Sequence, residues 1–584
     1  MDTACFDLLK TWCDALLEHQ ITELKQPELH GALLCPACGH IHGRCADAIY
    51  PLLYLADATG DARYLDAAKA LYAWTEYNMS RADGSFYNDA NHSWRGITVF
   101  FSIQLGESLL HHGHLLDAET KNRWTQRLIK AGEFMYTFFD DLETNINYPI
   151  TLSAAMAVIW KVTGDGRYLS KAKASAHSAL KFIAGDGLIF GESHPYPFDH
   201  VTEKGGRAVD LGYNVEESLA GLVNYALLTG DDIVLDAAAN SMRAHLEFML
   251  ADGGWDNSWG SRIAKWTYWG SRTSDGCQTA YALLAHRDPA FAQAAQRNLE
   301  LYARCTHNGL LHGGPMYESA GEPPCIHHTF CHAKSLAAIL RHGYRKPAYM
   351  PLPREAARGV RHFPTVNVSL LAAGPWRATV SNHDFEVVPE GNATGGALTM
   401  LWHKKAGPVC VAGMTDYQLT EPNNMQLSRR CDIVCQTPRA EYEKDGVCYR
   451  SINDKNAVVA CAGDDEIIVH ASGSLRDKEQ RDGGRCALVY TGAADCFKIG
   501  VTVDADNAFY YLPIIAASSD TVSLNGNEAV ITAASHRIIL RCSTKLRARD
   551  LTRRNFNPVA GFETIDFYCA LSRSEKTEFD IKID

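Results

Sequence analysis

The first 345 residues repeat one pattern, in which an apolar helix, a short turn and an amphipathic helix follow one another. The clearest copies turn at Gly60, Gly164 and Gly230, and weaker copies turn near His112, His286 and His342. Steps of roughly 50 to 65 residues separate the turns, which is typical of helical repeat architectures. Glycine suits the left-handed end of the first helix, and Asp61, Asp165 or Asp231 can cap the start of the second.

Helices that are apolar nearly all round belong inside a protein, whereas amphipathic helices cover the outside. The alternation therefore predicts two concentric rings, that is, an (α/α) toroid of about six helix pairs over residues 1–345. An open superhelix of helix pairs is the alternative.

The hydrophobic period changes to two after a linker at residues 346–364, which is rich in Pro and Arg. Runs such as ALTMLWH, AVVACAG and FKIGVTVD are typical of β-strands, and Asn525-Gly526 between two runs is a hairpin signal. Residues 365–584 are therefore predicted to form an antiparallel β-sandwich, so the fold class is multidomain α and β.

The composition limits the partners and the location. The 584 residues carry a net charge of −12, which argues against nucleic acid, because phosphate binding needs a basic surface. No apolar run approaches the length of a membrane span. The 18 cysteines are scattered singly, which favours reduced, buried thiols. The N-terminus resembles an amphipathic helix more than a signal peptide. We expect a cytoplasmic protein as the chain stands, or a periplasmic or secreted one if a leader has been removed; the oligomeric state is not predicted.

The inner helices of a toroid run in one direction, so the segments that precede them gather at one mouth of the ring. These segments are HIHGR (40–44), NHSWRG (91–96), NINYP (145–149), DLGYN (210–214), WGSRTSDG (269–276) and CIHHTF (325–330). A single His or Tyr before a helix is more often a packing or capping residue. Polar or aromatic groups in all six segments favour a functional site at this mouth.

Two long loops add further side chains to the mouth. One carries Trp255, Trp259, Arg262, Lys265 and Trp266, and the other carries His194 and Tyr196. Aromatic faces can stack on sugar rings, while Arg and Lys bind carboxylates. The positive ends of the inner helices also favour an anion. The expected partner is an acidic, uronate-containing glycan; packing in the core is the alternative explanation for the tryptophans.

The available groups favour elimination over hydrolysis. Hydrolysis usually needs two opposed carboxylates, and no pair stands out among Asp199, Glu216, Glu217, Asp256 and Asp275. Elimination across a uronate needs a group that neutralises the carboxylate and a base such as Tyr or His. A Tyr is a poor base unless cations lower its pKa, and Arg272 and Lys265 could do so.

The helix pairs, the linker and a β domain opening with GGALTMLWHKKAGPVCVAGMTDY resemble the toroid-plus-β-sandwich polysaccharide lyases of the heparinase II/III-like group. The rhamnose–glucuronate lyases are among the related toroid lyases. The resemblance implies cleavage at C4 of a uronic acid by β-elimination, with no cofactor required. It also leaves two alternatives open, which are a toroid glycoside hydrolase acting on uronate-containing glycans and a non-catalytic carbohydrate-binding protein.

The resemblance further implies roles for single residues. Asn147 occupies the position of the carboxylate neutraliser, Tyr213 (less well Tyr196) that of the base, and His327 or His328 that of the later His. The acidic-Ser-Tyr-His ending of the family's Tyr helix is replaced by Leu-Ala-Gly after Ser218, so His194 remains a rival base. The predicted catalytic residues are Tyr213, His194, Asn147, Arg272 and His328. The predicted substrate-binding residues are His42, Arg44, His92, Trp94, Arg95, Tyr148, Trp255, Arg262, Lys265, Trp269 and His327.

The stretch LLCPACGHIHGRC (33–45) carries a possible metal site. Cys35, Cys38, His40 and His42 could supply four zinc ligands. Four ligands within eight residues make a cramped chelate, because zinc sites usually take a second ligand pair from farther along the chain. The favoured interpretation is that His42 and Arg44 face the sugar and that Cys35 and Cys38 are buried thiols; a structural zinc or calcium ion is the alternative.

Overall fold

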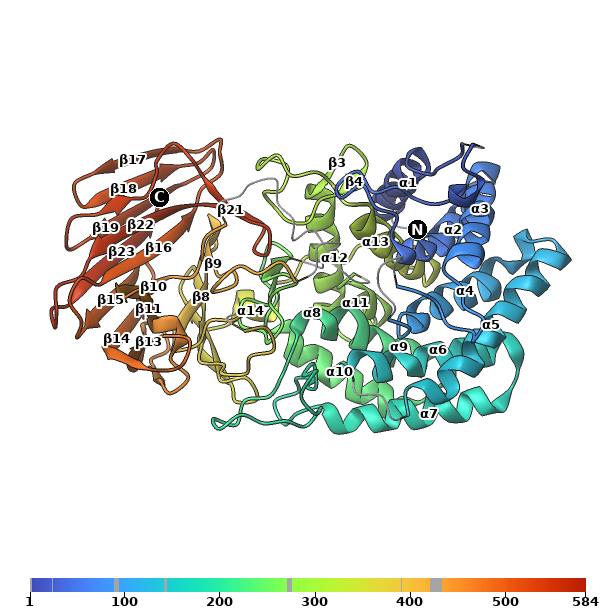
Figure 1. Cartoon of the computed structure of the whole chain (residues 1–584), viewed down its shortest axis with the longest axis horizontal. Helices are drawn as coiled ribbons and strands as arrows, with labels where there is room; N and C mark the ends of the chain where they lie inside the picture. Colours follow the sequence, from blue (N-terminus) through green and yellow to red (C-terminus); the bar gives the residue numbers. More distant parts are fainter. Residues whose placement is uncertain are drawn as a thin grey trace.

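The structure is a computed structural model that describes residues 3–23, 25–88, 94–140, 144–269, 276–389, 391–420 and 433–584. Helices occupy the N-terminal half and strands the C-terminal part, and the two regions lie side by side (Figure 1). Within the described ranges, no helix is both long and apolar enough to cross a membrane.

Six helices form a closed inner ring. Each packs against the next, and the last packs against the first. In ring order they are α2 (Ile49–Thr59), α4 (Thr98–His112), α6 (Asn147–Thr163), α9 (Leu219–Thr229), α11 (Thr279–Leu283) and α13 (Ile326–Arg341). The predicted toroid is therefore confirmed, and the open superhelix is wrong because α13 contacts α2.

A second ring of six helices covers the first, one outer helix against each inner one. In the same order they are α3 (Ala62–Asn78), α5 (Ala118–Phe138), α7 (Gly166–Ala179), α10 (Asp232–Leu246), α12 (Pro289–Arg304) and α1 (Thr3–Glu18). The sixth pair joins the first helix of the chain to the last inner helix (Figure 1). The two ends of the helical region thus meet at a seam between α1, α2 and α13.

The turns between paired helices are capped as the sequence predicts. Gly60, Gly164 and Gly230 end the inner helices with left-handed φ angles of 72°, 75° and 74°. The aspartate after each glycine accepts a backbone N–H from the first turn of the outer helix. These residues are Asp61, Asp165 and Asp231.

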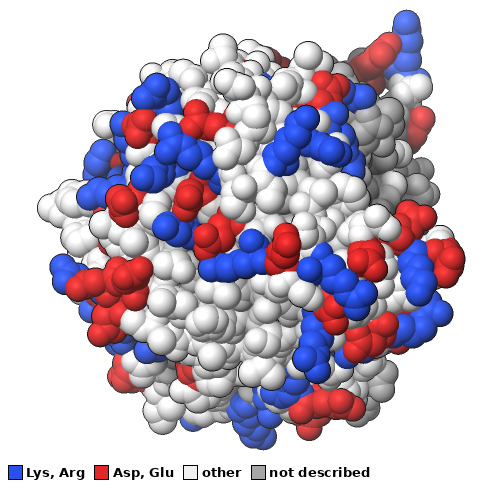
Figure 2. Space-filling view, turned by 90° about the vertical axis from the view of Figure 1, so that its left-hand side faces the viewer, with Lys and Arg blue, Asp and Glu red and all other residues white. Residues whose placement is uncertain are grey.

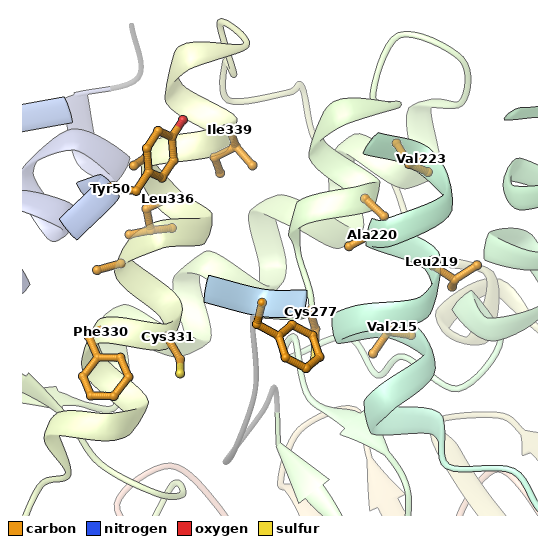
Figure 3. Packing of buried hydrophobic residues seen from close by; sticks show 14 of the residues in the cluster. Tyr50, Val215, Leu219, Ala220, Val223, Cys277, Phe330, Cys331, Leu336 and Ile339 are labelled. Atoms are coloured by element: carbon orange, nitrogen blue, oxygen red, sulfur yellow. The ribbon is translucent and has the colours of Figure 1, made fainter. Parts of the chain in front are cut away.

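The inner helices have almost no solvent-facing side, which explains why their sequences are apolar all round. Every residue from Ile150 to Ile159 of α6 is buried. Figure 3 shows Leu219, Ala220 and Val223 along α9, and Phe330, Cys331, Leu336 and Ile339 along α13. These side chains belong to one core that extends through the helical region.

The C-terminal part contains two antiparallel sheets, as predicted. The smaller has five strands, β5 (Gly359–Phe363), β6 (Val368–Ala373), β7 (Trp376–Ser381), β8 (Ala397–His403) and β9 (Gly407–Val411). Trp376, Val380 and Leu401 of this sheet share a core with side chains of the larger one. The two sheets therefore pack face to face as a β-sandwich.

The larger sheet has 14 strands in the described part of the chain, and β17 and β18 form the hairpin predicted at Asn525-Gly526. Its strands are β10 (Arg439–Lys444), β11 (Val447–Arg450), β12 (Val458–Ala462), β13 (Ile467–Arg476), β14 (Asp482–Gly492), β15 (Phe497–Val503), β16 (Phe509–Ile515), β17 (Thr521–Asn525), β18 (Glu528–Thr532), β19 (Arg537–Cys542), β20 (Arg547–Ala548), β21 (Asn555–Asn557), β22 (Phe562–Ala570) and β23 (Thr577–Ile583). Basic and acidic side chains are interspersed on the face of the molecule that this sheet forms (Figure 2). The described residues form no large patch of one sign on that face (Figure 2).

The predicted linker 346–364 is partly ordered into regular structure. It contains the short helix α14 (Pro353–Ala356), and β5 begins at Gly359, inside the predicted range. The periodicity of β5 was hidden because its two central residues, Arg361 and His362, are polar and exposed.

A buried ion pair joins the linker to both domains. Arg354, which is 2% exposed, lies 2.9 Å from Asp256 of the helical region, and Asp256 is fully buried. The guanidinium also donates to the hydroxyl of Thr379 in β7, at 2.6 Å. Asp256 ends β1 (Trp255–Asp256), which forms a short hairpin with β2 (Tyr268–Trp269). One charged group thus fixes the hairpin, the linker and the small sheet together.

Replacing Arg354 by Met should lower the free energy of unfolding by about 3 kcal/mol or more, because it leaves the Asp256 carboxylate buried without its cation. Chemical denaturation followed by tryptophan fluorescence measures the change. Arg537→Met is the control, since Arg537 pairs with Asp584 at the exposed edge of the β domain. Equal, small effects of both substitutions would contradict a structural role for the buried pair.

Candidate active site

The segments before α6 and α9 bring the central candidates together. Asn147 is the first residue of α6. Tyr213 ends the short helix α8 (Leu211–Tyr213), and a π-helical turn, Asn214–Ser218, connects it to α9. Inner helices α6 and α9 are neighbours in the ring, so both segments lie at the same part of the mouth. Single π turns within helices frequently mark functional sites.

Tyr213 is partly exposed, whereas the residues on either side of it are buried. Two cations face its ring, with the Arg262 guanidinium 5.3 Å and the Lys265 ammonium 5.6 Å from the ring centroid. Burial raises the pKa of Tyr213 well above 10, and the positive charge of Arg262 opposes that shift. The predicted lowering of this pKa by cations is therefore outweighed by burial, and Tyr213 is a phenol in the free protein.

The pKa of the Lys265 ammonium group lies near neutral pH. Its side chain is almost fully buried, and burial lowers the pKa of its ammonium group to about 7, with the nearby charge of Arg262 acting in the same direction. A negatively charged ligand placed beside Lys265 would favour the ammonium form and raise this pKa.

Asn147 is held by two carboxyl groups. Its backbone N–H donates to Glu192 at 3.0 Å, and its side-chain amide donates to Glu217 at 2.5 Å. The amide oxygen of Asn147 is buried and has no hydrogen-bond partner among the described residues. Glu192 also lies 3.5 Å from Arg262, and burial raises the pKa of Glu192 to about 8. The network fixes the Asn147 amide and connects it to the cation beside Tyr213.

Aromatic side chains form one wall of the mouth. The rings of Trp94 and Tyr148 meet edge to face, with centroids 5.2 Å apart, and both residues are partly exposed. Burial raises the pKa of Tyr148, and the negative charge of Glu217 adds to the shift. This pair offers the stacking surface that was predicted for a sugar ring.

The histidines of the mouth lie deeper than predicted. His327 is 7% exposed, His328 is 1% exposed, and the ring of His327 is 5.1 Å from that of His42. Both ring nitrogens of His327 are buried, and neither has a hydrogen-bond partner within the part of the chain that the structure describes. Burial lowers the pKa of His327 well below 6.5, so this ring is a neutral imidazole at the base of the mouth.

Three predicted substrate-binding residues lie elsewhere. Arg44 is buried and pairs with Asp47 at 2.7 Å, and Asp47 also pairs with Lys334 of α13. Arg95 pairs with Asp83 and lies over Phe138 of the outer helix α5. Trp255 is 0% exposed and packs against Tyr281. Because a residue that binds sugar needs an accessible face, the predictions for the buried residues Arg44 and Trp255 are corrected to structural roles. Arg95, whose side chain is 41% exposed, stays a predicted substrate-binding residue.

Four further predicted residues lie at the rim of the mouth or outside the described residues. His92 and Arg272 lie outside the described residues, and for Trp269 only the backbone, in β2, is described. His194 is exposed, and its backbone N–H donates to the side chain of Asn145 at 3.0 Å. His194 therefore remains a candidate base at the rim of the mouth.

Sequence reasoning missed two acidic residues of the site. Glu192 lies in GESHP, two residues before His194, and accepts the Asn147 backbone N–H. Asp210 caps α8 by accepting the backbone N–H of Tyr213. An Asp three residues before a helical Tyr is a recognisable N-cap signal, whereas nothing in the sequence connects Glu192 to Asn147.

A polar cavity lies behind the site, inside the ring. Its lining includes Glu217 together with Gln104, Glu107, Glu216, Lys334 and Arg341 from several inner helices. The interior of the toroid is therefore apolar between helices but charged along its axis.

The β domain holds the loop that carries both cations. The Trp259 carbonyl lies 3.0 Å from a ring nitrogen of His383, and Thr267 donates its backbone N–H to the Val559 carbonyl at 3.2 Å. Together with the Arg354–Asp256 pair, these contacts fix the loop on both sides of Arg262 and Lys265. Positioning of the two cations thus depends on residues of both domains.

Four sulfur and nitrogen groups cluster beside the mouth. The ligand atoms of Cys35, Cys38 and His42 all lie within 4.8 Å of one another. The Cys325 sulfur, from the residue before α13, lies 3.9 Å from that of Cys35. His40 is exposed and is not part of the cluster, so the predicted set of Cys35, Cys38, His40 and His42 is corrected at this position.

Two family models match the chain, the ulvan lyase N-terminal domain over residues 9–355 and the ulvan lyase C-terminal domain over residues 360–584. The chain is also 42% identical, over 577 residues, to a broad-specificity ulvan lyase of Formosa agariphila; the match covers 96% of this chain and 90% of that protein. The chain belongs to the ulvan lyase family. It is a polysaccharide lyase that acts on uronate-containing glycans by β-elimination. The hydrolase and binding-protein alternatives are therefore set aside.

Solved structures of lyases share the fold. Chondroitin AC lyase of Streptomyces coelicolor A3 matches with a TM-score of 0.55 and 11% identity, covering 99% of this chain and 79% of that one. Heparinase III matches with a TM-score of 0.54 and 11% identity, covering 92% of this chain and 75% of that one. The predicted resemblance to the heparinase-like group is confirmed.

The lowered pKa of Lys265 predicts a pH-dependent affinity for the uronate carboxylate. Lys265 carries a positive charge below about pH 7 and loses it above. Affinity for a uronate oligosaccharide should fall about tenfold between pH 6 and pH 8, as Lys265 loses its charge. Isothermal titration with the Tyr213→Phe variant, chosen to prevent turnover, measures this change.

Two substitutions test the assignment to Lys265. The affinity of Lys265→Arg for the oligosaccharide should stay constant between pH 6 and pH 8, because Arg stays charged. Lys265→Met should bind weakly at every pH, with no fall in affinity over this range. Lys161→Met, on the exposed end of α6, is the control and should show the same fall in affinity as the protein with Lys161. If the affinity of Lys265→Met still falls between pH 6 and pH 8, a group other than Lys265 causes the pH dependence.

Proposed function

We propose that this lyase depolymerises ulvan, with the uronate carboxylate bound between Asn147 and the two cations and with Tyr213 as the base and acid. The observation that supports this substrate is the 42% identity, along nearly the whole chain, to a broad-specificity ulvan lyase. The observations that support the residue roles are the contacts of Asn147 and the position of Arg262 and Lys265 beside the Tyr213 ring.

Asn147 is suited to neutralise the carboxylate. Its amide nitrogen has two hydrogens, and the bond to Glu217 occupies one of them. The second can donate to a carboxylate oxygen in the mouth, while Glu217 and Glu192 hold the amide in place. A carboxylate stabilised in this way spreads the charge that develops when the C5 proton leaves, which lowers the barrier to elimination.

Tyr213 then carries the proton. Because Tyr213 is a phenol in the free protein, it first releases its proton to solvent. The phenolate, stabilised by Arg262, then takes the proton from C5 of the uronate. Electrons of the C5–H bond form the C4=C5 double bond, and the C4–O bond breaks toward the leaving sugar. The Tyr213 phenol returns the proton to the departing oxygen. Proton and electron pairs balance, and no other reactant is required.

The aromatic side chains of Trp94 and Tyr148 provide a surface on which the sugar ring can stack. Trp94 and Tyr148 offer ring edges and faces next to Asn147, and Tyr148 directly follows Asn147 in the chain. A sugar ring stacked there would hold its carboxylate within reach of the amide and of Arg262. Stacking would contribute affinity, and the ionic groups would set the orientation.

The proposed polysaccharide substrate also indicates where in or outside the cell the enzyme acts. Cells meet polysaccharides outside the cytoplasm, so we place this enzyme in the periplasm or outside the cell rather than in the cytoplasm. The buried positions of cysteines such as Cys13, Cys277 and Cys410 would protect their thiols in that setting.

The Tyr213→Phe variant should lose activity on ulvan by about 10² to 10⁴-fold, because the phenol both removes and donates the proton. The assay follows the ultraviolet absorbance of the new double bond. Tyr196→Phe is the matched control, since Tyr196 is exposed and stacks on His200. Ulvan with its carboxylates reduced to alcohols should not be cleaved.

Three outcomes would contradict the proposal. A large loss in His194→Ala with an active Tyr213→Phe would make His194 the base. No double bond from ulvan, with activity on another uronate polymer, would overturn the substrate. Cleavage of the reduced polymer at the normal rate would overturn the role of the carboxylate.

The Asn147→Ala variant should lower kcat by about 10²-fold or more, because the charge that develops on the carboxylate loses a fixed donor. Glu217→Gln should have a smaller effect, since its amide can still accept from Asn147. Steady-state kinetics on ulvan measures both. An Asn147→Ala effect confined to KM would indicate that Asn147 only binds the ground state.

A further inference from the structure

Four side chains that can bind a soft metal meet at the seam where the ring closes. Cys35, Cys38 and His42 come from the segment before α2, and Cys325 immediately precedes α13. The Cys38 sulfur lies 3.3 Å from Nε2 of His42, and the Cys35 sulfur lies 3.9 Å from the Cys325 sulfur. Cys35, His42 and Cys325 are buried, each about 1% exposed.

These separations match those between the ligands of a tetrahedral zinc ion. Zn–S bonds of about 2.3 Å place two sulfurs about 3.8 Å apart, and a Zn–N bond of about 2.0 Å places sulfur and nitrogen about 3.5 Å apart. A disulfide would instead need a sulfur–sulfur distance of about 2.05 Å. The Cys38–His42 and Cys35–Cys325 pairs thus fit shared coordination, with Cys325 lying against Cys35 at the edge of the compact group of Cys35, Cys38 and His42. The distance also excludes a bond between Cys35 and Cys325 in this structure.

The local backbone brings the first three ligands to one side. Leu34 and Ile41 pair across a tight turn in which Cys35 donates its backbone N–H to the His40 carbonyl and Gly39 donates to the Cys35 carbonyl. Gly39 adopts a left-handed φ of 70° there. Cys35 and Cys38 sit on this turn, and His42 follows its second arm.

We propose that Cys35, Cys38, His42 and Cys325 bind one Zn²⁺ ion. Thiolates and imidazole select zinc over calcium, which prefers oxygen ligands. Four protein ligands fill a tetrahedral shell, so the ion has a structural role and leaves no position for substrate. Cys325 supplies the distant ligand that the sequence stretch alone lacks.

The ion would fasten the ring at its seam. Cys35 and Cys325 are 290 residues apart in sequence, so a shared metal closes a long loop of chain. It would also fix His42 against His327 at the base of the mouth. Removing the ion should therefore loosen the contact of α13 with α2.

Metal analysis of the full-length protein, purified without added metal, tests the site. Inductively coupled plasma mass spectrometry should find one zinc per chain, and cobalt substitution should give the visible bands of a tetrahedral thiolate site. Cys325→Ala and Cys38→Ala should both reduce the zinc to background. Cys331→Ala, on the same helix, and His40→Ala, on the same turn, are the controls and should keep one zinc.

Cys325→His guards against a loss caused by misfolding, because a Cys₂His₂ set still binds zinc. It should retain metal with a cobalt spectrum shifted toward fewer sulfurs. The proposal is overturned by wild-type protein without metal and with a Cys35–Cys325 disulfide, or by a zinc content that Cys325→Ala leaves unchanged. Metal content is read without substrate, so this result is independent of the activity on ulvan.

Discussion

Closure of the inner ring is the constraint on which the rest of the molecule depends. A helix that is apolar all round is stable only when other helices cover every side of it. Five inner helices receive an outer partner from the chain that follows, but α13 is followed by the linker and the strands. Its cover comes from α1, the first helix of the chain, and its inner neighbour is α2. The mouth, which is built from the segments before the inner helices, exists only because this seam is closed.

The electrostatics of the mouth follow from burial. Arg262 and Lys265 are placed beside Tyr213 together with Glu217 and Asp210, so part of their positive charge is offset before substrate arrives. Desolvation keeps Tyr213 protonated, Glu192 at a raised pKa and Lys265 at a lowered one. A polyanionic ligand shifts this balance toward the charged form of Lys265. The site is thus adapted to an acidic substrate although the whole chain has a net charge of −12.

Local sequence patterns predicted what depends on local physics. Helix period, glycine ends and aspartate caps gave the paired helices, and strand period gave the sandwich. Asn147 and Tyr213 were singled out because their segments precede inner helices and because they match positions of the heparinase-like lyases. The pairing of α1 with α13 and the approach of Cys325 to Cys35 join parts of the chain about 300 residues apart, which no local pattern reports. Trp255 was misassigned because the sequence pattern of a tryptophan near cations is the same in a buried core as in a sugar-binding site.

The anchoring of the cationic loop by the β domain has a consequence for the ancestry of such enzymes. Arg262 and Lys265 belong to the toroid by sequence, yet Arg354, His383 and Val559 hold their loop from the other side. Neither domain could be exchanged for a foreign one of the same fold without displacing the groups that face Tyr213. The toroid and the sandwich are therefore expected to be inherited as one unit, and their sequences to diverge in step along this boundary.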